Sequence, residues 1–331
     1  MKKVCIIGLG DISGIHINAL KKLKNAEISA VCDIDETLNK KYNEYKFYSN
    51  YEKMLEKESP DCVHVCLPHY MHYEVTVKAV KRGINVFLEK PVGMDVFQTN
   101  ELLKVENENP HIKICVCLQN RLNRTFEKME ELVKSGSYGK IKGIKGIVTW
   151  NRSDEYYNLK PWRKKMKYAG GGVMINQTIH TLDLMQLIGG KIESIKGATL
   201  NLGEHDSEFE VEDTSLAKIK FEKGIEGLYF ATVTYSENSS VELQVITEKA
   251  KFTIKDSILT VSEKNGCKKM LVEDDKLEGT KFYYGASHEK LIKKFYSCLE
   301  NDSNDYIHVK DAVPSMKMIE MIREASGKIM K

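Results

Sequence analysis

The sequence predicts an α/β protein with a doubly wound parallel sheet in its N-terminal part. A C-terminal α+β domain, built on a large, open, mostly antiparallel sheet, is expected to follow. Two observations predict this fold. Up to about residue 118, short β-branched runs alternate with amphipathic stretches, which is typical of βαβ units. Beyond that point, long alternating runs joined by turn residues take over, which favours antiparallel pairing.

The first predicted domain covers residues 1–120. Its predicted strands are the β-branched runs 4–7, 28–32, 62–67, 85–88 and 112–117. Its predicted helices are the amphipathic stretches 13–23, 73–82 and 96–106. Because parallel neighbours need a crossover connection, strands that alternate with helices imply a parallel sheet.

The second predicted domain covers residues 121–331. Its predicted strands are 141–150, 192–201, 215–221, 227–235, 241–247 and 251–254. Its predicted helices are 124–135, 173–188, 287–299 and 311–329. Mixed elements of this kind, with several strands in succession, are typical of an α+β domain.

Composition excludes several classes of function. The chain has 331 residues, and 50 Lys+Arg against 47 Asp+Glu give a formal net charge of +3. Such a balance creates no strong field, so we expect neither a nucleic-acid nor a membrane partner. The apolar run at the start stops at Gly8 and is too short for a signal peptide, and no stretch reaches the roughly 18 apolar residues of a membrane span.

The eight cysteines predict a reducing compartment, which we interpret as the cytoplasm. Most of them lie inside β-branched runs, where a free cysteine behaves as a small buried hydrophobe. No Cys-x-x-Cys pair offers the spacing of metal ligands, and no His-x-x-x-His motif occurs. We therefore expect no metal site.

A glycine turn follows the first predicted strand and opens the first predicted helix. Gly8 permits the tight turn, and Gly10 lets the backbone approach a pyrophosphate. Asp11 and Ile12 lie where the N–H groups of the helix start would meet that group. Ser13 replaces the third glycine of the usual fingerprint. A plain strand-to-helix turn also often contains glycine, but the strand–glycine–helix context favours a dinucleotide-binding Rossmann domain.

Asp33 ends the second predicted strand, about 20 to 25 residues after the glycines. A carboxylate there can accept hydrogen bonds from both ribose hydroxyls, whereas it would repel a 2'-phosphate. No arginine follows Asp33, so NAD is favoured over NADP as the cofactor. The alternative is that Asp33 merely caps the next helix.

The run from Ala169 to Asp183 is the second informative motif. Its glycines indicate a loop feeding a helix, on which Asn176, His180 and Asp183 recur at four- and three-residue spacing. The three side chains would project from one side of the helix. Polar groups on one face of an otherwise apolar helix are costly to bury without a purpose.

Together with the tripeptide Glu89-Lys90-Pro91, these motifs resemble those of the Gfo/Idh/MocA family of oxidoreductases. The resemblance covers nearly the whole chain. It implies an N-terminal Rossmann domain and a C-terminal domain whose large open sheet is usually a site of oligomer contacts. A homodimer or homotetramer is the corresponding expectation.

The resemblance also implies roles for single residues. Lys90 is similar to the family's active-site lysine and His180 to its catalytic histidine. Asn176 stands where many members have aspartate, and Thr178 where glycine is frequent. The residues expected beside the cofactor, in addition to the glycine turn and Asp33, are Leu67, His72, Glu89, Lys90, Trp162 and Arg163.

Alcohol oxidation with NAD requires one base and one polarising cation. The ordinary pKa of a histidine side chain is about 6.5, so His180 is suited to take the hydroxyl proton near neutral pH. Lys90 can stabilise the negative charge that develops on the alkoxide oxygen. Asn176 cannot ionise, so we expect it to orient the substrate hydroxyl. Asp183 could orient the imidazole or bind an arginine. The residues expected to meet substrate are Lys90, Arg121, Tyr157, Asn176, His180 and Tyr284.

Other histidines are interpreted conservatively. His16, His64 and His111 are expected to be structural or surface residues, while His288 could approach the substrate pocket. None of the four belongs to the motifs described above.

The sequence therefore predicts an NAD-dependent oxidoreductase that transfers a hydride to or from a secondary hydroxyl of a sugar, sugar derivative or cyclitol. Aromatic and arginine residues in 150–163 favour a carbohydrate, because rings stack on sugar faces and arginine binds hydroxyl or carboxylate groups. Two alternatives remain open at this point. One is a redox-assisted glycosidase that oxidises the sugar only transiently, and the other is a non-catalytic NAD-binding sensor.

Overall fold

The chain folds into two compact units in a computed structural model that describes residues 1–264, 266–275 and 286–329. Unit 1 comprises Met1–Gln119 and Ser287–Val313, and unit 2 comprises Asn120–Ala286 and Pro314–Lys331. The first boundary agrees with the predicted one at residue 120. Residues 287–313, which the sequence prediction assigned to the second domain, instead belong to unit 1.

Unit 1 is built on a six-stranded parallel sheet with the order β3-β2-β1-β4-β5-β6. Its strands are β1 (Lys2–Ile7), β2 (Ala26–Cys32), β3 (Lys46–Tyr48), β4 (Cys62–Val65), β5 (Asn85–Leu88) and β6 (Ile114–Val116). The strand order reverses between β1 and β4, and ligands of open α/β sheets bind at the carboxyl ends of strands beside such a reversal. The predicted doubly wound sheet is therefore confirmed.

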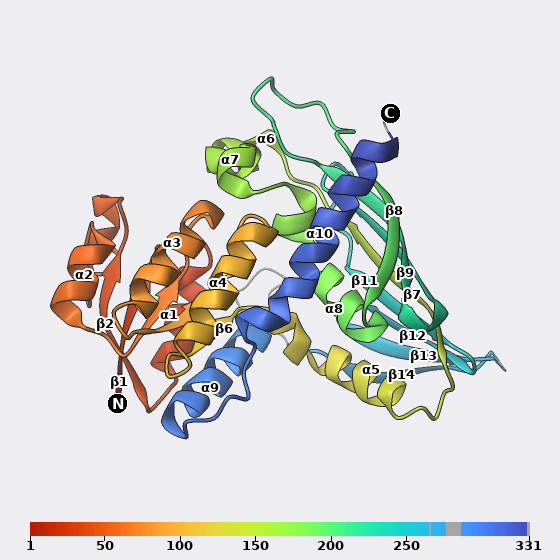
Figure 1. The fold of residues 1–331 in the computed structure, drawn as a ribbon, viewed down its shortest axis with the longest axis horizontal. Coiled ribbons are helices and arrows are strands. Elements are labelled where there is room, and N and C mark those ends of the chain that lie inside the picture. The colour runs from red at the N-terminus through yellow and green to blue at the C-terminus, as the bar shows by residue number, and fades with distance from the viewer. Residues whose placement is uncertain (265, 276–285, 330–331) are drawn as a thin grey trace. The chain divides into compact units, whose positions relative to one another are not determined.

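Helices cover both faces of this sheet (Figure 1). They are α1 (Ser13–Lys21), α2 (Tyr51–Glu58), α3 (His69–Val80), α4 (Val96–Glu108) and α9 (Ser287–Glu300). Helices α3 and α4 pack together, as do α1 and α9. Right-handed crossovers place α1 and α3 on opposite faces, because the chain leaves the central strands in opposite directions.

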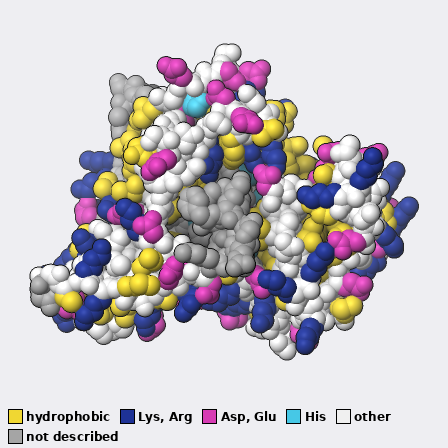
Figure 2. Space-filling model, turned by 180° about the vertical axis from the view of Figure 1, so that it is seen from behind, with side chains coloured by type: hydrophobic (Ala, Val, Ile, Leu, Met, Phe, Trp, Pro, Cys, Tyr) yellow, Lys and Arg dark blue, Asp and Glu magenta, His cyan; other side chains and the backbone are white. Residues whose placement is uncertain are grey.

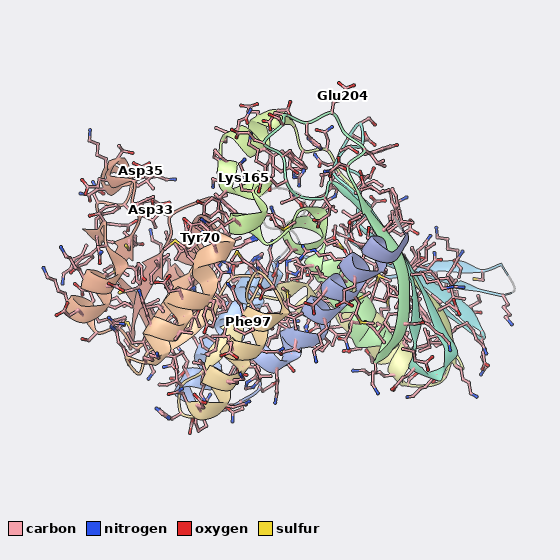
Figure 3. The ribbon with its side chains drawn as sticks, turned by 45° about the horizontal axis from the view of Figure 1, so that its top comes forward. Asp33, Asp35, Tyr70, Phe97, Lys165 and Glu204 are labelled. Carbon is pink, nitrogen blue, oxygen red and sulfur yellow. The ribbon has the colours of Figure 1, made fainter. Side chains whose placement is uncertain are left out.

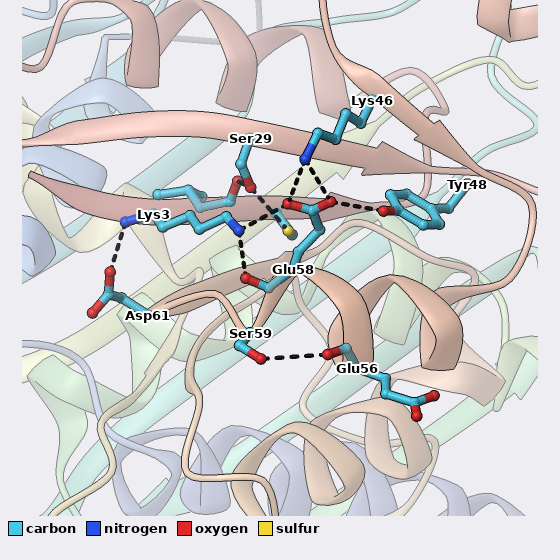
Figure 4. A network of polar contacts seen from close by, with 10 residues as sticks. Lys3, Ser29, Lys46, Tyr48, Glu56, Glu58, Ser59 and Asp61 are labelled. Atoms are coloured by element: carbon cyan, nitrogen blue, oxygen red, sulfur yellow. Dashed lines mark hydrogen bonds and ion pairs between the residues drawn. The ribbon is translucent and has the colours of Figure 1, made fainter.

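The sequence prediction missed β3 and α2, and one buried carboxylate explains why both form. Glu58, at the end of α2, is bound by Lys3, Lys46 and Tyr48 (Figure 4). The hydrogen bond from Lys3 and then that from Tyr48 lower the pKa of Glu58 to about 2. Strand β3 is too short to show a period, so this contact across the sequence, and not a local pattern, holds it in place.

Unit 2 is built on an eight-stranded sheet with the order β14-β13-β12-β11-β7-β10-β9-β8. Its strands are β7 (Ile141–Thr149), β8 (Ile192–Leu200), β9 (Thr214–Phe221), β10 (Ile225–Thr232), β11 (Glu242–Thr247), β12 (Ala250–Lys255), β13 (Ile258–Glu263) and β14 (Lys268–Glu273). Among the strand pairs of this sheet in the described residues, only β7–β10 is parallel. The prediction of a large, mostly antiparallel sheet is confirmed, although it did not include β13 and β14.

Five helices among the described residues accompany the large sheet, and two of them, the first and the fourth along the chain, pack against its strands. They are α5 (Arg124–Lys134), α6 (Asp154–Asn158), α7 (Met166–Ala169), α8 (Ile179–Gly189) and α10 (Val309–Ile329), the last of which begins in unit 1. Helix α8 lies directly on β7, where a Cβ added at Gly146 would sit 2.5 Å from Sδ of Met185. Glycine at this point of β7 thus allows the motif helix to lie close to the sheet.

Shorter helical segments connect these elements. They are η1 (Glu36–Lys40), η2 (Gln119–Leu122), η3 (Pro161–Lys164), η4 (Val173–Gln177) and η5 (Glu222–Gly224). Segment η4 is a π-helical turn and the other four are 3₁₀ helices.

The surface agrees with the balanced composition. Figure 2 shows basic and acidic side chains interspersed on the face seen there, with no large field of one sign. All eight cysteines are free, and all except Cys267 are buried, as expected from their β-branched surroundings. Within the described part of the chain, no helix combines the length and hydropathy that crossing a membrane requires.

Candidate active site

The glycine turn of unit 1 lies at the reversal of strand order. Gly8 has a φ of +92°, and its N–H donates to the carbonyl oxygen of Cys32 at 2.8 Å. A Cβ at this position would lie 2.5 Å from the carbonyl oxygen of Cys66, which follows β4. Both the conformation and the contact with backbone exclude any larger residue, so Gly8 holds the turn close to the sheet edge.

Helix α1 begins at this turn. Its N-cap residue is Ile12, whose side chain cannot cap the first N–H groups. The Oγ of buried Ser13 donates to the carbonyl oxygen of Gly10 at 2.7 Å, which explains why serine replaces the third glycine here. A helix start without a side-chain cap, next to a glycine turn, suits a pyrophosphate. Gly8, Gly10, Asp11 and Ile12 all lie in this turn or at the start of α1, and their contact with a cofactor stays a prediction.

Asp33 lies at the carboxyl end of β2, at the edge of the sheet where Figure 3 also labels Asp35. Its Oδ2 accepts the N–H of Leu9 in the glycine turn at 2.7 Å, and its Oδ1 accepts the N–H of Asp35 at 3.0 Å. The residue that caps the following helix, η1, is Asp35, which accepts from Thr37. Asp33 is therefore joined to the glycine turn and is not the helix cap.

Two further turns follow β4 and β5. His72, buried in α3, bridges them: its Nδ1 lies 2.6 Å from the carbonyl oxygen of Pro91 and its Nε2 lies 2.8 Å from that of Leu67. Burial lowers the pKa of His72. Because a neutral imidazole has one N–H, it donates to one of the two carbonyl groups at a time. His72 thus connects the Leu67 turn to the Lys90-Pro91 turn, whose peptide bond is cis.

Glu89 faces the interior of unit 1, although the sequence placed it among the cofactor contacts. It is 5% exposed, and its Oε1 lies 2.9 Å from Nε2 of His16. His288 is also buried in unit 1, with its Nε2 3.8 Å from the same oxygen. Among the described residues, the side chains of His16, Glu89 and Cys117 are close enough to share an ion. Since His16 and Glu89 bond each other directly, we assign no metal to them.

In unit 2, the glycine run does not feed one continuous helix. The chain forms the π-helical turn η4, which ends at Thr178, and only then enters α8. The predicted single helix over 173–188 is therefore wrong at its start. Gly172 explains the change, because a Cβ there would lie 1.9 Å from the carbonyl oxygen of Glu212, to which Val173 donates. The backbone at Gly172, directly before η4, therefore packs closely against the segment that precedes β9.

Asn176 lies in the π-helical turn and His180 in the first turn of α8, both half-buried. The Nδ2 of Asn176 donates to the hydroxyl oxygen of Tyr156 at 3.3 Å, and Nε2 of Gln177 donates to the same oxygen at 3.4 Å. Once both lone pairs of that oxygen accept amide hydrogens, the hydroxyl proton of Tyr156 is left to donate elsewhere. With Nδ2 so engaged, the carbonyl end of Asn176 serves as an acceptor.

Asp183 takes the second of the two roles left open for it. Its carboxylate, 1% exposed, accepts two hydrogen bonds of 2.7 Å from Nε and Nη2 of Arg121 and one of 2.6 Å from Oγ of Ser315. A bidentate arginine pair of this kind is strong and geometrically specific. Asp183 thus anchors α8. Arg121 was expected to meet substrate, but two of its three guanidinium nitrogens donate to Asp183.

The aromatic and basic cluster before the glycine run is half-buried. Trp162 and Arg163 lie in η3, and the guanidinium carbon of Arg163 lies 4.1 Å from the ring centre of Tyr156. Tyr157, which the sequence placed in the substrate site, is 3% exposed and packs edge-on against Tyr156 and Phe209. Tyr284 falls outside the described residues.

Tyr156 is the residue that the sequence reasoning missed. It is one of the aromatic residues in 150–163, and its hydroxyl oxygen accepts the hydrogen bonds of the Asn176 segment described above. Helix α6 is one short helix of five residues, too short for its period to show which neighbour faces inward. The signal that could have separated Tyr156 from Tyr157 is the i, i+1 rule, since adjacent helical residues do not share a face.

Comparisons with known proteins show the family. Residues 2–119 match the family model described as "Oxidoreductase family, NAD-binding Rossmann fold". Residues 126–253 match the GFO/IDH/MocA C-terminal domain. The two matches together span most of the chain, and they divide it close to the boundary between the units.

Individual relatives are more distant. Myo-inositol 2-dehydrogenase of Thermotoga maritima is 26% identical over 235 residues, 68% of this chain and 67% of that protein. D-glucoside 3-dehydrogenase of Escherichia coli is 26% identical over 256 residues, 71% of each.

A solved structure with a similar fold is that of the WlbA dehydrogenase of Bordetella pertussis in complex with NADH and UDP-GlcNAcA. It has a TM-score of 0.84 at 22% identity and covers 98% of this chain and 96% of that one. Identity this low shows the fold alone. The two family matches carry the assignment, and the chain belongs to the Gfo/Idh/MocA family of oxidoreductases, with an NAD-binding Rossmann domain.

Proposed function

We propose that this oxidoreductase transfers a hydride between NAD and a secondary hydroxyl of a sugar, sugar derivative or cyclitol. The observation that carries the proposal is that one chain contains both an NAD-type glycine turn bonded to Asp33, in unit 1, and the Asn176–His180 segment, in unit 2. When bound, NAD supplies the nicotinamide carbon that accepts or returns the hydride.

The residues of unit 1 fit NAD. Gly8 keeps the turn flat against β4, the start of α1 offers N–H groups to the pyrophosphate, and the ionised side chain of Asp33 lies beside the turn, where a ribose hydroxyl can donate to it. A 2'-phosphate at that position would meet the negative charge of Asp33. NAD is therefore the proposed cofactor in preference to NADP.

His180 is the proposed proton acceptor. In the oxidising direction it takes the hydroxyl proton of the substrate while the hydride leaves the same carbon, and in the reducing direction it returns that proton. Lys90, at the carboxyl end of β5, is proposed to donate a hydrogen bond to the reacting oxygen and to stabilise its developing negative charge.

Asn176 and Tyr156 are proposed to orient the substrate. The amide nitrogen of Asn176 is bound to Tyr156, so its oxygen can accept a hydrogen bond from a sugar hydroxyl. An orienting role of this kind suits Asn176, because its amide cannot take a proton. His180 is then the proton acceptor of the segment, with Asn176 holding the hydroxyl in line.

The carbohydrate class is supported by the names of the relatives, which act on myo-inositol and on D-glucosides. The half-buried cluster of Tyr156, Trp162 and Arg163 supports it as well, because aromatic faces and guanidinium groups bind sugars and their acidic derivatives. These residues belong to the same unit as Asn176 and His180.

The test is a panel of free sugars, glycosides, inositols and nucleotide sugars with purified protein and NAD, followed at the NADH absorption band. On the best substrate, His180→Gln and Lys90→Gln are expected to lower kcat about 10²- to 10⁴-fold, the range that acid–base and electrostatic groups supply. NADH binding to His180→Gln should stay at the wild-type level. Wild-type turnover in either variant would refute the assignment, and glycoside cleavage without NADH accumulation would favour a redox-assisted glycosidase.

We also propose that the chain forms a homodimer or homotetramer through the large sheet of unit 2. The face of this sheet opposite α8 carries exposed apolar side chains at Leu216, Leu228 and Ile246. Light scattering coupled to size exclusion should give a mass of two or four chains, and Leu228→Glu should reduce it to one. A monomeric wild type would contradict this proposal.

A further inference from the structure

A row of buried, hydrogen-bonded polar side chains crosses the interior of unit 1 and has no part in the hydride transfer proposed above. Nδ1 of His16 lies 2.8 Å from Nδ1 of His64, and Nε2 of His16 lies 2.9 Å from Oε1 of Glu89. Nε2 of His64 lies 3.1 Å from the hydroxyl oxygen of Tyr296. These side chains come from α1, β4, the end of β5 and α9, and they are at most 5% exposed.

The protons of this row of side chains have one consistent arrangement. Burial alone lowers the pKa of His16, but Cys66 and Glu89 beside it raise that pKa to about 10. Burial alone raises the pKa of Glu89, but the hydrogen bond and charge of His16 hold it well below the usual range. At neutral pH the two therefore form an ion pair, in which the His16 imidazolium donates from both ring nitrogens.

His64 must then be neutral. Burial and the charge of His16 lower its pKa, and its Nδ1 accepts the proton that His16 donates. Its single proton is on Nε2, from which it donates to Tyr296. The positive charge of the His16 imidazolium thus sets the direction of each hydrogen bond in this row of side chains.

The ion pair joins the two segments of unit 1 that matter for the cofactor. His16 lies in the first turn of α1, three residues after Ser13. Glu89 directly precedes Lys90, and its Oε2 accepts the backbone N–H of Lys90 at 3.3 Å. A displaced Glu89 would therefore shift both the Lys90 turn and the start of the pyrophosphate helix.

We propose that the buried His16–Glu89 ion pair is a positioning device for NAD, which holds the start of α1 and the Lys90 turn in register. In this proposal the pair acts through those two segments and not by contact with the cofactor. Removing one partner leaves the other charge buried and unpaired. The start of α1 and the Lys90 turn must then move to expose that charge to water.

The pair also makes a prediction about pH. The groups that face it are Cys66, Cys117, His64, His288, Lys90 and Tyr296. The pKa of His16, raised to about 10, keeps its imidazolium charged in the folded chain until the pH approaches that value, and the lowered pKa of Glu89 keeps its carboxylate charged except in acid. Wild-type NADH affinity should therefore not change with the charge of this pair between about pH 6 and pH 9.

The experiment is an NADH fluorescence titration of the full-length chain across that pH range. His16→Gln and Glu89→Gln are each expected to raise the dissociation constant about tenfold or more, and the double variant by less than the product of the two. In Glu89→Gln the affinity should become pH-dependent near neutrality, because His16 loses a partner that raises its pKa. Glu106→Gln is the matched control: its carboxylate, also buried in unit 1, accepts from the N–H of Val309, so it should lower stability and not affinity.

A measurement on the wild type keeps the proposal testable if the variants fold poorly. Side-chain ¹⁵N spectra of histidine-labelled protein should show one imidazolium that stays charged up to pH 8.5, bonded to a neutral ring with its proton on Nε2. The proposal is overturned if no such imidazolium exists, or if Glu89→Gln binds NADH as tightly and with the same pH profile as Glu106→Gln. Because NADH binding needs no substrate, this outcome is independent of the proposed reaction.

Discussion

At the scale of single residues, adjacent side chains of the same type have different roles. Tyr157 packs in the interior of unit 2, where burial raises the pKa of its hydroxyl well above the usual value. Tyr156, one position earlier, is half-buried and accepts hydrogen bonds from the Asn176 segment. The difference follows from the roughly 100° that separates consecutive helical residues.

Tyr156→Phe should lower kcat/KM about three- to tenfold. The change keeps the ring under Arg163 but removes the acceptor of two amide hydrogen bonds, each worth about 1 kcal/mol. Steady-state kinetics on the substrate found in the panel would measure it. Tyr157→Phe is the control, and it should lower thermal stability and leave kcat/KM nearly unchanged. If Tyr157→Phe lowered kcat/KM more than Tyr156→Phe did, the orienting role would belong to Tyr157.

Asp33→Ser should weaken NADH binding about tenfold or more while weakening NADPH binding less. A charged hydrogen bond to a ribose hydroxyl is worth about 1.5–3 kcal/mol, and the substitution also removes the repulsion of a 2'-phosphate. Fluorescence titration with both nucleotides would measure the ratio. Asp35→Ser, which affects only the cap of η1, should leave that ratio unchanged.

At the scale of elements, the glycine run shows how a correct period can accompany a wrong boundary. The spacing of Asn176, His180 and Asp183 predicted one α-helix, but a π-helical turn intervenes. Oγ1 of Thr178 donates to the carbonyl oxygen of Val173 at 3.0 Å, five residues back, and Thr178 also bonds Tyr229. A π-helical turn is common at functional sites and leaves no hydrophobic period of its own.

Gly172→Ala should destabilise the protein by about 3 kcal/mol. Its Cβ would collide with the carbonyl oxygen of Glu212, a backbone atom that cannot rotate away. Chemical denaturation followed by the fluorescence of Trp150 and Trp162, both in unit 2, would report it. Gly14→Ala is the opposite control: it meets no atom within 4 Å inside α1 and should stabilise by about 0.5–1 kcal/mol.

At the scale of the whole molecule, unit 1 should be the part that is sensitive to acid. Burial lowers the pKa of His288 to about 4, and burial together with the charge of His16 holds the pKa of His64 well below its usual value. A histidine whose pKa is lowered by folding is protonated first in the unfolded chain, so its contribution is lost as pH falls below about 6.5. The pKa of Glu58, lowered to about 2, adds a loss that begins near pH 4.5.

The free energy of unfolding of unit 1 should therefore fall between pH 7 and pH 5, by about 2 kcal/mol from His288 alone. Hydrogen exchange in the central strands β1, β4 and β5 would measure it, because neither tryptophan belongs to this unit. His288→Gln should remove that part of the pH dependence. An equal loss of protection in this variant and the wild type would show that His288 is not the cause.

The fold and the cofactor turn were largely predictable from the sequence, whereas the site was predictable only in part. Strand–helix alternation, the glycine turn and Asp33 are local patterns; the alternation gives the observed parallel sheet, and Asp33 is bonded to the glycine turn. Strand β3 and helix α2 were missed because a contact between distant residues, made through Glu58, stabilises them. Residues 287–313 could not be assigned to unit 1 because helical periodicity does not tell which sheet a helix covers.

The sequence by itself determined which residue types the protein carries for its chemistry and which elements hold them. Only the tertiary structure decided which of those side chains meet: Asp183 with Arg121, Tyr156 with Asn176, and Glu89 with His16. The physical reason is that a local period specifies the face on which a side chain projects. What that face packs against depends on burying apolar surface and pairing every buried polar group across the whole unit.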